Sequence, residues 1–140
     1  MARNFQPNPR FLDRAAGKVA AAAERAAALG RDRARELVED AGGHGIQHRG
    51  LPRRSSAPDE PPASQTGELA ASIDSGLVSA SREQAIGRFG SNAPHAALME
   101  LGGAPIRRYG ARVGLLPRPY LRPALEERKG RMLAELRDVL

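Results

Sequence analysis

The chain has 140 residues, a formal net charge of +6 and no cysteine. A chain of this length is expected to form one domain, residues 1–140, and the absence of cysteine excludes disulfides, thiolate catalysis and cysteine metal sites. Only 4% of the residues are aromatic, while 15 are Gly and 11 are Pro. This composition predicts long irregular stretches and a core of small aliphatic side chains, so we expect the chain to order fully only against partners of its own kind.

The basic residues are nearly all arginine, since only Lys18 and Lys129 are lysines. They alternate with acidic residues along both long helical stretches, a pattern typical of solvated faces, and no motif that reads DNA sequence is present. Non-specific contact with DNA or with an acidic protein surface stays open. No window is apolar enough to predict a membrane span or a secretory signal. We therefore expect the protein in the cytosol or inside a larger particle.

Residues 1–41 predict a long N-terminal helix. Asn8 followed by Pro9 is typical of a helix start, and Gly42 with Gly43 is typical of a helix end. Gly30 predicts a bend within the helix. Small apolar residues recur at three- and four-residue spacing and predict one narrow buried stripe. These are Leu12, Ala15, Val19, Ala22, Ala26 and Leu29.

Residues 42–65 predict an extended arm. They are rich in glycine and then in proline, a composition that favours an extended chain over a packed element. A loop of this length is usually functional or disordered. We expect the arm to lie on another subunit, with Pro61 and Pro62 in the contact.

Residues 66–140 predict an α+β core. Thr66 is expected to cap a short helix, and strands are expected at 73–80 and 84–89 with a hairpin turn between them. Another short helix is expected at 95–101. Its inward residues are expected to be Ala97, Leu98 and Leu101.

The C-terminal part begins with a basic loop or irregular hairpin at residues 104–115. The prolines at positions 117, 119 and 123 then prevent a helix before about Arg122, and a helix follows to near Val139. Its apolar face is expected to contain Leu125, Met132, Leu133 and Leu136. The expected fold is thus α+β, with a long N-terminal helix, a small antiparallel sheet, short flanking helices, a C-terminal helix and an extended Pro-rich arm.

The sequence predicts no catalytic, cofactor-binding or metal-binding residue. His44 and His48 have the spacing of metal ligands on a helix, but the glycines around them disfavour a helix. No serine lies in a nucleophile elbow, and the stretch around Ser91 is better explained as a helix start that Ser91 or Asn92 caps. Glu100 is expected to form an interface salt bridge with an arginine. A small hydrolase is therefore the least favoured class.

Three stretches in a fixed order carry a resemblance to a known family. They are APDEPPASQTGELAASI at 57–73, GSNAPHAALMELGG at 90–103 and LPRPYLRPALEE at 116–127. Together they resemble the HK97 gp10-like family of tailed-bacteriophage neck and tail-completion proteins, whose members carry P-P-x-x-x-T-G-x-L-x-x-S-I, then Y-A-x-x-x-E-F-G, then R-P-F-L-R-P-A. The sequence departs from this pattern at His95, where the family has Tyr, and at Leu101 and Tyr120, where it has Phe.

The resemblance implies a structural virion protein at the head–tail interface of a siphovirus-like phage or a gene transfer agent, assembled in the cytoplasm of a bacterial host. It implies an α+β subunit of a six-fold ring beside the connector (stopper) and tail terminator proteins, with heterologous contacts between copies. Arginines facing the lumen would touch genome DNA without reading its sequence. The expected contact residues are Pro61, Pro62, Arg107, Arg108, Arg112, Tyr120 and Leu121. The alternatives are a tail terminator, a minor tail protein or a basic non-specific DNA-binding protein.

Overall fold

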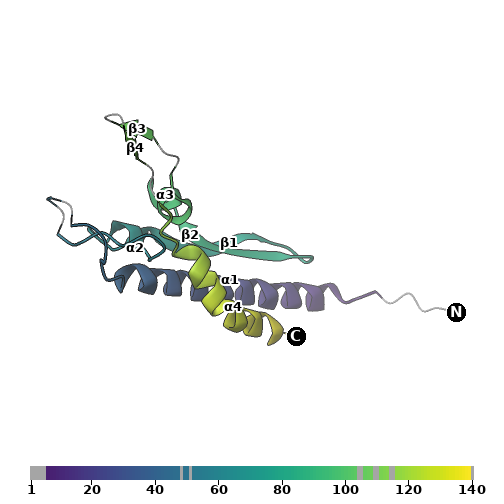
Figure 1. The fold of residues 1–140 in the computed structure, drawn as a ribbon. Helices are drawn as coiled ribbons and strands as arrows, with labels where there is room; N and C mark the ends of the chain where they lie inside the picture. The colour runs from purple at the N-terminus through teal and green to yellow at the C-terminus, as the bar shows by residue number, and fades with distance from the viewer. Residues whose placement is uncertain are drawn as a thin grey trace.

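The computed structural model describes residues 6–47, 49–50, 52–103, 106–108, 111–113 and 116–139. The fold is α+β, as the sequence predicts, with a long helix along which a hairpin and a C-terminal helix pack (Figure 1). In chain order the elements are α1 (Pro9–Glu39), α2 (Glu68–Ser72), β1 (Ile73–Ala80), β2 (Ala85–Ser91), α3 (Ala96–Leu101), β3 (Ile106–Arg108), β4 (Ala111–Val113) and α4 (Leu121–Arg137).

Helix α1 is the spine of the molecule. Its start is as predicted, because the Asn8 side chain accepts the Arg10 N–H at 2.9 Å and Pro9 occupies the first turn. The helix has 31 residues, which corresponds to a length of about 46 Å. The β1–β2 hairpin runs beside it, and α4 crosses it obliquely (Figure 1).

The buried face of α1 consists of small residues. It contains Ala22, Ala23, Ala26, Ala27, Gly30, Ala34 and Val38. The buried face includes Ala22 and Ala26 of the predicted stripe but not the other residues of that stripe. The helix continues through Gly30, and a Cβ at that position would overlap the ring of Phe89. Glycine at this position is therefore explained by the close approach of β2, not by the end of a helical segment.

The β1–β2 hairpin is antiparallel, with its register running from Ile73 opposite Ser91 to Ala80 opposite Ala85. The first strand has the predicted bounds, and the second is shifted toward its C-terminal end. A register shift between Leu77 and Ser79 forms a bulge. At the start of α2, the N-cap is Gly67 with φ 80° and not the predicted Thr66, although the Thr66 hydroxyl accepts the Glu68 N–H at 3.3 Å.

The inward face predicted for α3 is wrong. Leu98 is 49% exposed and Leu101 is 76% exposed, whereas Ala96 is buried and Met99 packs against the core. The helix has this rotation because Glu100 reaches across to the start of α4. Two large leucines are therefore left on the outer side.

The inward face predicted for α4 is confirmed at Met132 and wrong at its three leucines. Leu125, Leu133 and Leu136 are between 40% and 46% exposed, whereas Ala124 and Met132 are buried. The charged side of the helix faces α1 instead, since ion pairs join the two helices. These pairs are Arg25 with Glu135, Arg33 with Glu127 and Arg128 with Glu36. The alanine face of α1 allows a close approach, and the aliphatic stems of these long side chains pack around it.

Candidate functional site

The core brings together the three sequence stretches that carry the family resemblance. Leu69 and Ile73 come from the first stretch, Ala96 from the second, and Tyr120 and Ala124 from the third. They pack with the last turns of α1 in one cluster of buried residues. The apolar residues of the three stretches therefore form part of the core of this fold.

Glu100 joins α3 to α4. Its carboxylate accepts the backbone N–H groups of Tyr120 at 2.8 Å, Leu121 at 2.9 Å and Arg122 at 2.9 Å. The first N–H groups of a helix have no partner within the helix, and a carboxylate at this end also interacts favourably with the helix dipole. The Glu100 carboxylate thus serves the start of α4 within its own chain, and the predicted interface salt bridge to an arginine stays a prediction.

Tyr120 is fully buried in its own chain, so its predicted role as a contact between subunits is wrong. Leu121 is half-buried and packs against the same core. Burial raises the pKa of Tyr120, and the Ser91 hydroxyl acts in the opposite direction. The geometry with Ser91 does not close into a hydrogen bond, because the buried Tyr120 oxygen has no partner among the described residues.

The Pro-rich segment is hydrogen-bonded to its own chain, and its predicted contact with another subunit stays a prediction. Arg118 donates from its Nε to the Ser56 carbonyl at 3.1 Å, and the Asp59 N–H donates to the Pro117 carbonyl at 3.1 Å. Pro62 is buried, while Pro61 is half-buried. The Arg118 side chain and the Pro117 carbonyl, just before α4, thus supply hydrogen-bond partners that the proline-rich segment cannot provide for itself.

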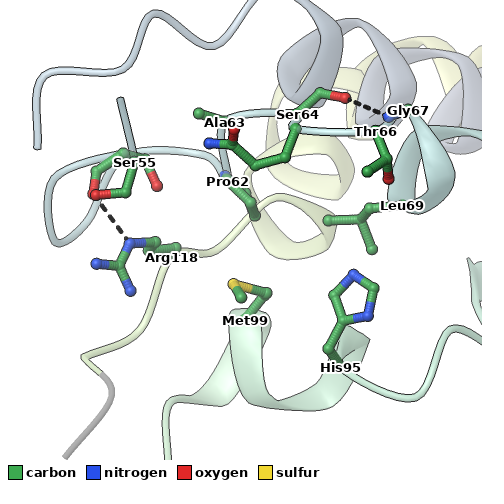
Figure 2. Close-up of a pocket in the computed structure, with 12 residues that line it drawn as sticks. Ser55, Pro62, Ala63, Ser64, Thr66, Gly67, Leu69, His95, Met99 and Arg118 are labelled. Atoms are coloured by element: carbon green, nitrogen blue, oxygen red, sulfur yellow. Dashed lines mark hydrogen bonds between the residues drawn. The ribbon is translucent and has the colours of Figure 1, made fainter. Parts of the chain in front are cut away.

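A cavity of about 350 Å³ lies between this segment and α3 (Figure 2). Pro62, Leu69 and Met99 supply apolar walls, and the His95 imidazole points into the same space (Figure 2). Arg118 lines one side, but its guanidinium also donates to the Leu116 carbonyl at 3.4 Å. The cavity is mostly apolar with a polar margin, which suits an apolar side chain better than a charged ligand.

Acidic residues lie close in sequence to the cavity wall, but none is among the residues that line the cavity, where Arg118 is the charged side chain. Residues 57–68 contain three carboxylates and no lysine or arginine. The carboxylates are Asp59, Glu60 and Glu68. Glu60 accepts the Ala57 N–H at 2.9 Å and pairs with His44 at 2.9 Å, and these two contacts lower its pKa, the first more strongly.

The predicted contact arginines lie in the β3–β4 hairpin, which projects away from α1 (Figure 1). Arg107 stands opposite Arg112 in the register, and Arg108 stands opposite Ala111. The side chains of this hairpin lie outside the described residues. The backbone thus brings the three arginines together on one projection, and their role in a contact stays a prediction.

The described residues contain no cluster of three or more side chains suited to a metal ion. His44 pairs with Glu60, and His48 lies outside the described residues. The hydroxyls of Ser72 and Ser91 are 2.6 Å apart, and Ser91 also accepts the Ala93 N–H. The predicted cap is wrong, because the N-cap of α3 is His95. None of the helices in the described ranges is both long and apolar enough to cross a membrane.

The chain matches no protein-family model, no curated protein sequence and no solved structure. The family resemblance of the three stretches therefore stays a prediction.

No role is predicted from the sequence for Phe11, the large apolar residue at the start of α1. Phe11 is 66% exposed in the first turn of α1. The positions three and seven residues further along are Arg14 and Lys18, which place Phe11 on a charged face of the helix. The charged residues at this spacing are the sequence signal that predicts an exposed Phe11.

Proposed function

We propose that the chain is a structural subunit of the head–tail interface, a neck or tail-completion ring, of a siphovirus-like phage or a gene transfer agent. The observation that carries this proposal is the position of the three family-like stretches. Their apolar residues form the core and Glu100 of the second stretch caps the helix that begins in the third, so the parts that match the family are the parts on which this fold depends. The phage assignment rests on the resemblance of these stretches.

The surface of the chain supports an assembly role. Its accessible area is 10225 Å², whereas a compact monomer of 15.0 kDa exposes about 7000 Å². The leucines of α3 and α4 face outward and provide apolar area for contacts between subunits. A ring of repeated heterologous contacts would cover such surfaces on every copy.

The experiment is native mass spectrometry and negative-stain imaging of the purified protein, together with mass spectrometry of particles produced from the genome that encodes it. We expect closed rings and the presence of the chain in tailed particles. A monodisperse monomer that is absent from particles would overturn the proposal. Tight, steeply salt-dependent DNA binding by that monomer would favour the basic DNA-binding alternative.

A matched pair of variants tests whether the outward leucines of α4 serve assembly. Leu133→Asn should weaken the oligomer and leave the unfolding of the monomer nearly unchanged, because Leu133 is 40% exposed. Lys129→Asn changes an exposed position of the same helix and should leave both properties unchanged. If Leu133→Asn unfolds the chain instead, the leucine belongs to the core of the subunit.

A further inference from the structure

We propose that the turn of the β1–β2 hairpin of one copy docks in a groove on the hairpin of the next copy. The hairpin turn comprises residues 81–84, and the hairpin groove lies over residues 72–77 and 88–92 at the other end of the same hairpin. The occupant is a second copy of this chain, and the contact is head-to-tail because it joins two different surfaces. This inference rests on the proposed ring and names a contact that would build it.

The hairpin groove has a volume of about 310 Å³ and a mostly polar lining, in which Asp74 and Arg88 are the charged side chains. Asp74 accepts the Ser75 N–H at 2.8 Å. Its charge is also matched within the chain, because the carboxylates of Asp32 and, more weakly, Asp74 raise the pKa of Arg31. Arg88 is exposed and has no hydrogen bond or ion pair among the described residues. It is therefore the charged group of the groove that is left for a partner.

Two glycines keep the floor of the hairpin groove open. A Cβ atom added at Gly76 or Gly90 would meet nothing within 4 Å. Gly87 is different, because a Cβ atom there would overlap the Ala23 carbonyl of α1. Glycine weakens the interior of a strand and often marks a position where another backbone approaches closely. For Gly87 this backbone is α1, whereas the space above Gly76 and Gly90 is available to a partner.

The hairpin turn is an ordered segment at the free end of the hairpin (Figure 1). The Ser81 hydroxyl accepts the N–H groups of Glu83 and Gln84, each at 3.2 Å. The Ser81 N–H donates to the Gln84 carbonyl at 2.8 Å. Arg82 pairs with Asp13 of α1 at 2.6 Å, which holds the turn beside the helix. A segment that is ordered before binding loses less conformational freedom when it docks.

The charges of the two surfaces are complementary. The hairpin turn carries one acid, Glu83, which is exposed and has no side-chain partner among the described residues. Docking brings Glu83 to Arg88, so that two groups without partners form one pair. The planar guanidinium can bind both oxygens of a carboxylate, which also fixes the orientation of the contact. Two grooves are both concave and cannot fill one another, so the arrangement favours a head-to-tail contact.

The hairpin turn cannot fill the groove of its own copy. From Gly76 the strand continues to Ala80 before the turn begins, a distance of about 13 Å in an extended strand. The turn and the groove thus lie at opposite ends of one extended element (Figure 1). Their contact joins neighbouring copies and can repeat from copy to copy.

The first test is crosslinking of the full chain, which has no cysteine of its own. Gln84→Cys labels the hairpin turn, and Gly90→Cys labels the groove, where an added side chain has open space. A short bis-maleimide should give covalent dimers in a mixture of the two variants and none with either variant alone. Dimers from either variant alone would show a symmetric contact and overturn the proposal.

Exchange of the two charges tests the ion pair. Glu83→Arg should weaken self-association about tenfold or more in analytical ultracentrifugation, because it places an arginine opposite Arg88. Arg88→Glu should have the same effect, and the double variant should recover most of the loss. Glu24→Arg is the control, since it makes the same change of net charge at an exposed position of α1 and should leave self-association unchanged. A double variant as weak as the single ones would overturn the pairing.

A matched pair of glycine substitutions tests the floor of the groove. Gly76 and Gly130 both have open space around an added Cβ atom, so Gly76→Gln and Gly130→Gln should both fold, as circular dichroism checks. Gly76→Gln fills the groove and should abolish self-association, whereas Gly130→Gln changes α4 and should preserve it. Equal self-association of the two variants would contradict a turn docked above Gly76.

The outcomes separate the two proposals. If the unmodified protein forms rings but the mixed cysteine variants do not crosslink, the hairpin contact is wrong and the ring proposal stands. If the variants crosslink in open oligomers that never close, the hairpin contact stands and the ring proposal fails. If the unmodified protein is a monomer at every concentration in native mass spectrometry, both proposals fail.

Discussion

The carboxylate of Glu100 accepts the backbone N–H of Tyr120 at 2.8 Å, so a side chain of α3 completes the start of α4. The same carboxylate accepts the next two N–H groups along the chain. Tyr120 is at the same time fully buried in the core. One residue thus has its backbone fixed by α3 and its ring buried in a cluster that includes residues of α1 and α2.

Glu100→Ala should lower the free energy of unfolding by about 1–2 kcal/mol, because the first N–H groups of α4 lose their acceptor. Urea denaturation measures the loss. Glu126→Ala is the control, since this carboxylate is exposed on α4 and bonds only Arg122 one turn before it, at 3.2 Å. It should change stability by about 0.5 kcal/mol or less. Equal effects of the two variants would contradict the capping role.

Gly30→Ala should destabilise the protein by about 1–2 kcal/mol, although alanine favours a helix. The new methyl group would meet the Phe89 ring, and overpacking of this kind outweighs the helix propensity gained. Gly17→Ala in the same helix has open space around the added carbon and should stabilise by about 0.5–1 kcal/mol. Thermal unfolding of the two variants gives shifts of opposite sign. Stabilisation by both would mean that Phe89 moves aside without cost.

Tyr120→Phe should leave stability within about 1 kcal/mol of the parent and shift it upward, because the buried hydroxyl has no hydrogen-bond partner. Tyr120→Ala should cost about 3–5 kcal/mol, as expected for loss of a buried ring. Chemical denaturation checks both variants. A loss above about 2 kcal/mol for Tyr120→Phe would show that the hydroxyl bonds Ser91 in solution. Phe is also the residue that the resembling family carries at this position.

Alkaline pH should unfold the chain through Tyr120. Burial raises its pKa above the ordinary value of 10.0, so the folded state holds the phenol proton more tightly than the unfolded state does. The stability contributed by the neutral phenol is fully present below the unfolded pKa and is lost as the pH rises above it. In a Tyr109→Phe background, phenolate absorbance should appear only together with unfolding. Phenolate formation in the folded chain would contradict the burial.

Much of the fold follows from local sequence signals. Asn8 and Pro9 predict the start of α1, and residues 73–80 predict the first strand with its observed bounds. These predictions succeed because caps, prolines and strand-like alternation act on nearby residues. The facing of α3 and of the leucines of α4 is predicted wrongly, because it depends on contacts between elements. Glu100 sets the rotation of α3, and ion pairs to α1 turn the leucines of α4 outward.

The candidate site was only partly predictable. Pro61 and Pro62 were expected in a contact with another chain, and Pro62 does line the cavity, but as part of its own fold. The acceptors that hold this segment down, at Ser56 and Pro117, are backbone carbonyls, which carry no sequence signal. The cavity itself depends on α3 lying opposite residues 55–67. These two segments are distant in the sequence, and sequence patterns describe only nearby residues.

The length of α1 also affects when its buried face can be covered during synthesis. Helix α1 comes first, yet its alanine face is covered by a hairpin that ends at Ser91 and by a helix that ends at Arg137. Until the hairpin and α4 have been synthesised, that face lacks its packing partners. A helix without such partners has little stability, because most helical stability in proteins comes from packing. The buried face of α1 can therefore be fully covered only after α4 has been synthesised.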